Sequence, residues 1–177
     1  VLGGELELSS PATTNSPVGD YPITAGGLTS TNYGITFSNG TLRVTAYALS
    51  VSASNQSRAY GAANPELTGR VEGLQNGDNI TATYATVAET NSPMGGYPIT
   101  IGLLDPDGRL SNYAVTTNNG MLTVSAAALR VVAHDASRAY GATNPVVSGT
   151  ISGIQNGDNI TATYATTATE TSPVGGY

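Results

Sequence analysis

The chain lacks several residue types, and each absence removes a kind of chemistry. It contains no cysteine, no lysine and no tryptophan, and one histidine among 177 residues. Without cysteine there are no disulfides, thiolate metal sites or thiol nucleophiles. Without lysine there is no Schiff base, P-loop lysine or lysine–asparagine isopeptide cross-link. A single histidine cannot form a multi-histidine metal site. No apolar run approaches the roughly 20 residues that span a bilayer, so we expect no membrane insertion.

Charge is also scarce, and it is acidic. Six arginines against twelve aspartates and glutamates give a formal net charge of −6. Nucleic acids and anionic membranes require clustered cations, so neither is an expected partner. No nucleophile occurs with a base and an orienting partner, and no carboxylate pair recurs with polar neighbours. The sequence therefore predicts a protein that is not an enzyme and that uses no cofactor.

The abundant residues favour β-structure. The chain contains 25 threonines, 16 serines, 14 asparagines and 22 glycines. Threonine, valine, isoleucine and tyrosine favour strands, whereas glycine and asparagine separate them. Apolar residues alternate with polar ones, which is typical of half-buried strands. The predicted inward faces are Leu49/Val51/Ala53, Ile80/Ala82/Tyr84, Tyr97/Ile99/Ile101, Tyr113/Val115 and Leu122/Val124. This pattern predicts an all-β fold of small, immunoglobulin-like β-sandwich repeats.

The sequence repeats with a period of about 80 residues. Residues 75–86 return unchanged as residues 155–166. Residues 48–97 match residues 128–177 at 32 of 50 positions without a gap. Chance does not produce such a match, so the chain is a tandem array.

The start of the chain belongs to a third copy, because residues 15–24 match residues 91–100. Only Ala126–Ala128 separate two consecutive repeats, with no glycine, proline or charged spacer. We therefore expect tightly coupled domains arranged as a rod. The predicted domains are the C-terminal half of a repeat at 1–47, a complete repeat at 48–126 and the N-terminal part of a repeat at 127–177.

Asparagine–glycine pairs predict turns. Asn39-Gly40 and Asn119-Gly120 lie between strands, where positive φ at both residues suits a tight hairpin. Asn76–Asn79, which recurs at 156–159, is predicted to be a turn closed by its own side chains.

Asp105–Gly108 resembles the opening of a calcium loop. The bidentate glutamate that should close such a loop is absent, and the first copy has Gly26-Gly27-Leu28 in its place. We therefore predict a surface turn here and no metal site.

The block Ser57-Arg58-Ala59-Tyr60-Gly61, repeated at 137–141, is the most specific segment that is not an evident strand. Tyr60 is expected to be half-buried with its hydroxyl bonded, and Arg58 to pair with Asp78 or to stack on the tyrosine ring. This interpretation makes the block an architectural brace. The alternative is a glycan-binding site, because tyrosine and arginine are favoured in sugar sites. The candidate ligand-binding residues are Arg58, Tyr60, Arg138 and Tyr140.

The ordered motifs resemble the MBG domain of the YGX type over essentially the whole chain. They are Leu-x-Val-x-Ala, Tyr-Gly-x-x-Asn-Pro (60–65), Gly-x-x-Asn-Gly-Asp (73–78), Ser-Pro-x-Gly-x-Tyr-Pro-Ile-Thr (92–100), Asn-Tyr (112–113) and Asn-Gly-x-Leu-Thr-Val (119–124). The resemblance implies tandem arrays in bacterial surface and secreted proteins, often beside filamentous-haemagglutinin-like adhesin regions. The family name suggests mucin binding. The family also leaves a β-grasp-related topology open, and the lack of a helical pattern over residues 67–79 argues against it.

These observations predict a stalk or fibre segment of an extracellular, cell-surface bacterial adhesin or filament. The alternative is a glycan- or mucin-recognition module with host or environmental glycans as partners. Residues 127–177 lack the segment equivalent to 98–124, and residues 1–47 carry it. We therefore expect head-to-tail pairing with self or with adjacent repeats, by strand addition between molecules. The alternative is that the same halves are joined within a longer polypeptide.

Overall fold

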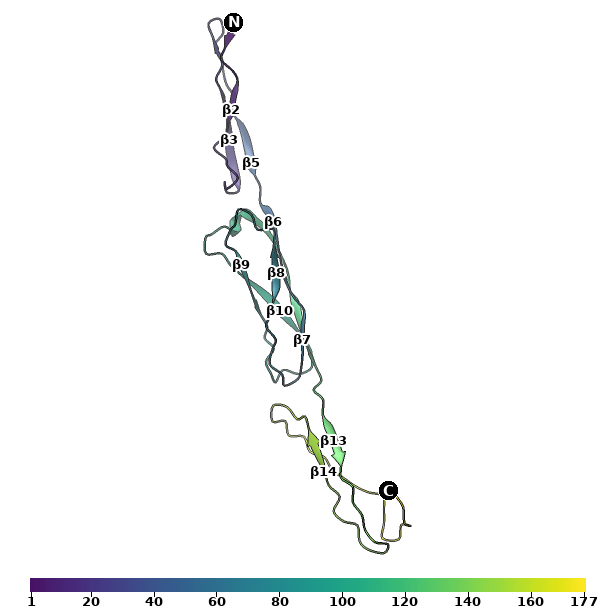
Figure 1. Cartoon of the computed structure of the whole chain (residues 1–177). Helices are drawn as coiled ribbons and strands as arrows, with labels where there is room; N and C mark the ends of the chain where they lie inside the picture. The colour runs from purple at the N-terminus through teal and green to yellow at the C-terminus, as the bar shows by residue number, and fades with distance from the viewer. The chain divides into compact units, whose positions relative to one another are not determined.

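The computed structural model describes all 177 residues, and its regular secondary structure consists almost entirely of strands (Figure 1). Its one helical element is the 3₁₀ turn η1 (Leu110–Asn112). This confirms the predicted all-β fold. The strands are β1 (Leu2–Gly3), β2 (Glu7–Ser9), β3 (Gly19–Gly26), β4 (Thr29–Ser30), β5 (Gly40–Val44), β6 (Tyr47–Ala53), β7 (Gln56–Ala59), β8 (Gly69–Glu72), β9 (Thr81–Ala85), β10 (Gly95–Leu104), β11 (Tyr113–Asn118), β12 (Gly120–Ser125), β13 (Arg130–Ala133) and β14 (Gly149–Ser152).

The chain forms two compact units. Unit 1 consists of Val1–Ser54, Leu67–Thr86 and Pro98–Met121. Unit 2 consists of Asn55–Glu66, Val87–Tyr97 and Leu122–Tyr177. Unit 1 therefore contains the whole N-terminal copy, unit 2 contains the whole C-terminal copy, and each includes part of the central repeat.

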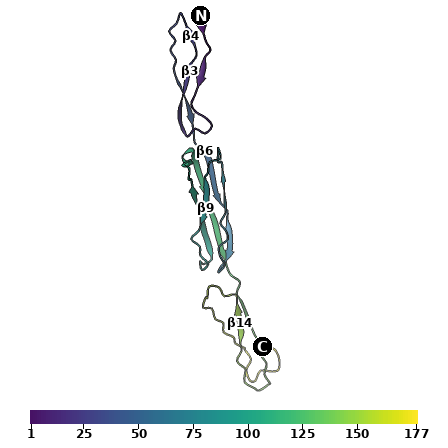
Figure 2. The same cartoon turned by 60° about the vertical axis from the view of Figure 1, so that its left-hand side comes forward.

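In the N-terminal copy, β3 is the middle strand of a three-stranded antiparallel sheet in the order β2-β3-β5. Tyr21 of β3 lies opposite Leu42 of β5. Strands β1 and β4 form a separate antiparallel pair, and Figure 2 shows β3 and β4 in the purple part of the chain. Asp20 of β3 and Arg43 of β5 form an ion pair at 3.6 Å. Both side chains are exposed, so the pair contributes little stability.

The core of unit 1 lies between two layers of strands from the central repeat. One layer has the order β11-β6-β8, and the other contains β9 and β10 within a sheet of order β7-β12-β10-β9. The buried cluster consists of Leu49, Val51, Ile80 and Tyr113, and the apolar residues that pack against it include Val71 of β8, Ala82 of β9 and Ile101 and Leu103 of β10. The predicted inward faces thus form a sandwich core. Val115 is the exception, because it is 38% exposed on β11.

The predicted hairpin at Asn119-Gly120 is wrong. Strand β11 pairs in parallel with β6, and β12 pairs in parallel with β7, so the chain passes from one sheet to the other at Asn119. Neither residue has positive φ. Glycine is required at 120 because a Cβ there would lie 2.7 Å from the carbonyl oxygen of Ser54. Asn39-Gly40 also lacks positive φ, and Gly40 pairs with Ile23 of β3.

In unit 2, β7 pairs with β12, whose Leu122 and Val124 are buried. In the C-terminal copy, β13 pairs antiparallel with β14, the yellow-green strand in Figure 2. Strand β7 has no counterpart among the sequence predictions. Its one buried residue is Arg58, so the alternation of apolar and polar residues that identifies a strand is missing there.

Candidate functional site

Arg58 holds the Ser-Arg-Ala-Tyr-Gly corner of the central repeat together. It is only 7% exposed. Its Nε donates to Oδ1 of Asn64 at 2.7 Å, its Nη1 to the carbonyl oxygen of Ala59 at 3.1 Å, and its Nη2 to the carbonyl oxygen of Glu89. Nδ2 of Asn64 donates in turn to the carbonyl oxygen of Ala88 at 2.6 Å. The guanidinium and Asn64 therefore join the corner to the segment 88–89.

Tyr60 and Gly61 contact the following copy, within unit 2. The half-buried Tyr60 donates its hydroxyl to Oδ1 of Asp158 at 3.2 Å. Gly61 has φ +82°, and a Cβ added to it would lie 2.5 Å from Cβ of Gln155. The expectation that Tyr60 is half-buried with a bonded hydroxyl is confirmed. Its partner lies 98 residues away in the following copy.

The equivalent corner of the C-terminal copy has the same local bonds. Arg138 donates from Nε to Oδ1 of Asn144 at 2.6 Å, from Nη1 to the carbonyl oxygen of Ala139 at 3.1 Å, and from Nη2 to the carbonyl oxygen of Thr169. Arg138 is only half-buried, however, and Tyr140 is 69% exposed. The two lie beside an open cavity of about 720 Å³.

Arg58 does not form the expected ion pair with Asp78. Its donors go to Asn64 and to carbonyl oxygens, whereas Asp78 accepts the hydroxyl of Tyr113 at 2.7 Å. Each of the three guanidinium nitrogens of Arg58 thus donates to an acceptor of the corner or of the neighbouring residue Glu89. The ligand-binding role of Arg58, Tyr60, Arg138 and Tyr140 stays a prediction.

The Gln-Asn-Gly-Asp segment is a turn, as predicted, but a backbone hydrogen bond closes it, and the side chains of Asn76 and Asp78 bond other segments instead. The amide N–H of Asp78 donates to the carbonyl oxygen of Gln75 at 2.9 Å, and Asn76 has φ +54°. In unit 1, Nδ2 of Asn76 donates to the carbonyl oxygen of Thr14 at 3.2 Å. In unit 2, the equivalent Nδ2 of Asn156 donates to the carbonyl oxygen of Thr90 at 3.3 Å.

We call these two contact zones the joints. Joint 1, in unit 1, is defined by Thr14, Val18, Asn76 and Asn112, and joint 2, in unit 2, by Tyr60, Thr90, Asn156 and Asp158. In joint 1 the amide N–H of Val18 also donates to Oδ1 of Asn112 at 3.0 Å. The sequence predicts the turns but not the joints. Their only signal in the sequence is the block 75–86, which recurs unchanged at 155–166. The recurrence indicates that both copies use these residues in the same way, but it does not identify the residues that they contact.

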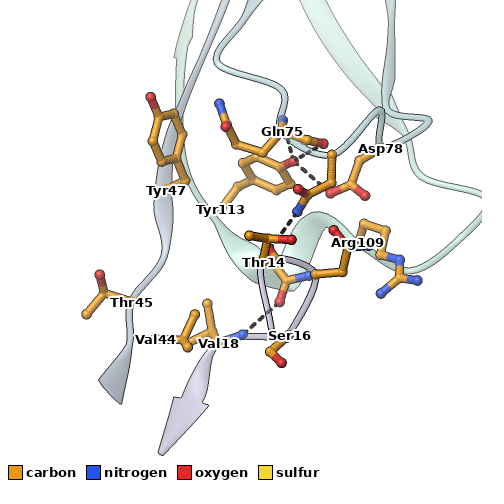
Figure 3. Close-up of a pocket in the computed structure, with 13 residues that line it drawn as sticks. Thr14, Ser16, Val18, Val44, Thr45, Tyr47, Gln75, Asp78, Arg109 and Tyr113 are labelled. Atoms are coloured by element: carbon orange, nitrogen blue, oxygen red, sulfur yellow. Dashed lines mark hydrogen bonds between the residues drawn. The ribbon is translucent and has the colours of Figure 1, made fainter. Parts of the chain in front are cut away.

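Joint 1 borders a cavity of about 490 Å³ (Figure 3). Tyr113, only 8% exposed, lies at its edge between Gln75 and Asp78. Its hydroxyl donates to Oδ2 of Asp78 at 2.7 Å and accepts the backbone N–H of Gln75 at 2.9 Å. Burial, followed by the hydrogen bond to Asp78, raises the pKa of the Tyr113 hydroxyl above its ordinary value.

The loop that resembles a calcium site uses its carboxylate internally. Oδ1 of Asp105 accepts the backbone N–H of Arg109 at 2.9 Å, and Oδ2 accepts that of Leu110 at 2.7 Å. Gly108 has φ +65°, as a turn of this kind requires. The Asp105 carboxylate therefore holds the backbone N–H groups at the start of the 3₁₀ turn η1. No group of three or more metal-binding side chains comes together in the structure.

Comparison with protein families gives one match, which covers nearly all of the chain. The profile of the MBG domain (YGX type) matches residues 2–43, 49–123 and 129–177. The chain belongs to this family. MBG domains are repeat domains of surface proteins and are not an enzyme family. The Tyr-Gly of the type name corresponds here to the Tyr60-Gly61 corner and its copy at 140–141.

Searches of curated proteins and of solved structures found no match to this MBG chain. No helix in the structure has the length and hydrophobicity that crossing a bilayer requires.

Proposed function

We propose that the chain is a stalk or fibre segment of an extracellular bacterial adhesin or surface filament, with no catalytic role. The observation that carries this proposal is one contact that recurs at both joints. Asn76 bonds the carbonyl of Thr14, and Asn156 bonds the carbonyl of Thr90. A contact reproduced between consecutive copies favours a fixed relation between them, which a segment that transmits force needs.

The connections between copies support the same role. Two residues separate β5 from β6, and four separate β12 from β13. Neither connection contains glycine, and such short connections restrict the freedom of neighbouring repeats. The acidic, threonine-rich surface favours solubility of a long array.

Strand order supports resistance to tension. The first strands of the central repeat, β6 and β7, pair in parallel with its last strands, β11 and β12. Tension applied where the chain enters β6 and leaves β12 pulls these parallel partners in opposite directions along their axes. The hydrogen bonds of each ladder are then loaded together in shear, and shear resists force better than breaking the bonds one after another.

Spin-label distance measurements on the whole chain test the stalk proposal at joint 1. Because the chain has no cysteine, Glu7→Cys and Leu104→Cys give two unique labelling sites, both exposed and both in unit 1. We expect a narrow distance distribution that Asn76→Ala broadens. Asn79→Ala, in the same segment, is the matched control. A distribution already broad without Asn76→Ala contradicts a fixed joint.

Single-molecule pulling and a glycan array complete the test. We expect one high-force unfolding event from the central repeat. Uniformly low unfolding forces contradict the role under tension.

On a glycan array the stalk role predicts no specific binding. Saturable binding that is lost in Arg138→Ala and Tyr140→Ala assigns the chain to glycan recognition instead, at the cavity that these two residues border.

A further inference from the structure

The chain contains four asparagine–glycine pairs, and the fold places them in two kinds of surroundings. The pairs begin at Asn39, Asn76, Asn119 and Asn156. Gly40 opens strand β5 and pairs with Ile23 of β3. Gly120 opens strand β12 and is buried, and a Cβ added to it would lie 2.7 Å from the carbonyl oxygen of Ser54. The glycines of the first and third pairs are therefore fixed in strands.

The other two pairs lie in exposed turns. Asn76-Gly77 and Asn156-Gly157 are exposed, and no atom outside the neighbouring residues lies within 4 Å of a Cβ added to either glycine. No hydrogen bond engages the backbone N–H of either glycine. The whole central repeat carries Asn76 at joint 1, and the whole central repeat precedes Asn156 at joint 2. The exposure is therefore the same on both sides of a complete copy.

We propose that Asn76 and Asn156 are sites of spontaneous deamidation, and that this modification opens the joints. The inference goes beyond the stalk role, because it assigns a covalent change to the contact between copies.

The reaction needs water as its only co-reactant. The backbone nitrogen of Gly77 attacks Cγ of Asn76 and closes a succinimide ring, while Nδ2 leaves as ammonia and takes the proton of the Gly77 N–H. Water then opens the ring. Attack at Cγ gives aspartate, and attack at the main-chain carbonyl carbon gives isoaspartate. Glycine favours ring closure because it has no Cβ to obstruct the approach of its nitrogen.

The leaving group is the group that forms the joint. Nδ2 of Asn76 donates to the carbonyl oxygen of Thr14 at 3.2 Å, and Figure 3 shows the bond that reaches Thr14. Nδ2 of Asn156 donates to the carbonyl oxygen of Thr90 at 3.3 Å. Ring closure requires the side chain to leave this acceptor and to turn back toward its own backbone. The joint contact therefore slows the reaction that destroys it.

The product cannot restore the contact. An ionised carboxylate accepts hydrogen bonds but donates none, so the carbonyl oxygen of Thr14 loses its donor and faces a negative charge. This charge lies close to Asp78 in a chain whose net charge is already −6. Isoaspartate also lengthens the main chain of the turn that the N–H of Asp78 closes onto Gln75. Deamidation thus replaces an attraction by a repulsion, and the opened joint stays open.

Peptide mapping of the whole folded chain during incubation at mildly alkaline pH tests the proposal. Cleavage after arginine places the four pairs in separate peptides, which are 1–43, 71–109, 110–130 and 139–177. Mass spectrometry then locates each amide that has become a carboxyl group. We expect Asn76 and Asn156 to convert at least about tenfold faster than Asn39 and Asn119, because a pair held in a strand reacts only after local opening. Equal rates at the four sites overturn the proposal.

Asn112→Ala tests the link between the reaction and the joint. This change removes the Oδ1 that accepts the N–H of Val18 in joint 1, whereas joint 2 is unchanged and Asn156 serves as the internal control. We expect Asn76 to convert about threefold faster, the effect of one exposed hydrogen bond on the opening of the joint. If neither site responds, or if both respond alike, the joint does not control the reaction and the proposal is wrong.

Spin-label distances measure the consequence on the chain that carries Glu7→Cys and Leu104→Cys. Asn76→Asp reproduces one product directly and should broaden the distance distribution, as incubation does. Asn79→Asp adds the same charge at an exposed position of the same segment, and this matched control should stay narrow. A narrow distribution in Asn76→Asp contradicts the opening of the joint. The peptide map does not depend on a fixed joint, so the modification and the stalk role can fail independently.

Discussion

Arg58 and Arg138 occupy the same position in two copies and make the same three hydrogen bonds, yet Arg58 is buried and Arg138 is only half-buried. The bonds are local, because all the partners lie within 31 residues of the arginine. Burial of Arg58 depends on more distant parts of the chain, since β7 pairs with β12 some 66 residues later. Hydrogen bonding of the corner is therefore a property of the repeat, whereas its burial is a property of the completed domain.

The largest expected difference comes from removing the two arginines. Arg58→Ala removes a buried side chain together with its three hydrogen bonds, one of which is the donor to Oδ1 of Asn64. This change should cost about 3 kcal/mol of unfolding free energy. Arg138→Ala exposes its acceptors to water and should cost less than about 1 kcal/mol. Urea unfolding with region-resolved hydrogen exchange measures both. Equal losses would show that burial does not determine the energy of this corner.

Tyr113 and its counterpart Tyr33 extend the comparison to unit 1. Tyr113 is 8% exposed and Tyr33 is 71% exposed. Tyr113→Phe deprives Asp78 and the Gln75 N–H of their shared partner and should cost about 2 kcal/mol. Tyr33→Phe should change stability by less than about 0.5 kcal/mol. Thermal melts of the two variants at pH 7 measure this difference in stability. A loss in Tyr33→Phe as large as in Tyr113→Phe would contradict it.

The raised pKa of Tyr113 makes the free energy of unfolding depend on pH, and Tyr33→Phe should leave this dependence unchanged. Because the folded-state pKa lies above the ordinary value of about 10, the folded chain retains a proton that the unfolded chain releases. Its contribution to stability is complete below about pH 10 and is lost as the pH rises through the folded-state pKa. Urea unfolding between about pH 8 and 11 should show a smaller alkaline loss in Tyr113→Phe. Parallel curves for both variants would refute the assignment.

The two joints should respond alike to the loss of their asparagine side chain. Asn76→Ala and Asn156→Ala each remove one exposed hydrogen bond between copies and should cost less than about 1 kcal/mol. Thermal melts measure the stability of both variants, and amide relaxation measures the motion of the neighbouring copies. We expect a small shift in midpoint and a clear gain in motion in each case. A change at only one joint would show that the two contacts are not equivalent.

The smallest expected effect is that of calcium. Asp105 uses both carboxylate oxygens for backbone N–H groups, and the first copy has Gly26-Gly27-Leu28 at this place. Melting curves with calcium and with chelator should therefore superimpose. A shift above about 5 °C, on the order of 1 kcal/mol, would show that the loop binds the ion.

Much of the fold could be predicted because its signals are local. The alternation around Leu49 and Val51 gave the correct inward face, and the Asn76-Gly77 turn forms with the positive φ that its residues favour. The failures share one cause. Strand β7 has a buried arginine in place of an apolar residue, and Gly120 avoids a carbonyl oxygen of a residue 66 positions earlier. Neither fact is visible in the neighbouring residues.

By itself, the sequence determined the tandem repeat, the all-β class, the turn at each Asn-Gly-Asp and the family. These follow from periodicity, from the backbone freedom of glycine and asparagine, and from the identity between copies. Only the tertiary structure decided that Tyr60 bonds Asp158, that Asn76 bonds Thr14 and that β6 and β11 run in parallel. Each of these contacts joins residues more than 60 positions apart, so only the folded chain brings together the donor and the acceptor.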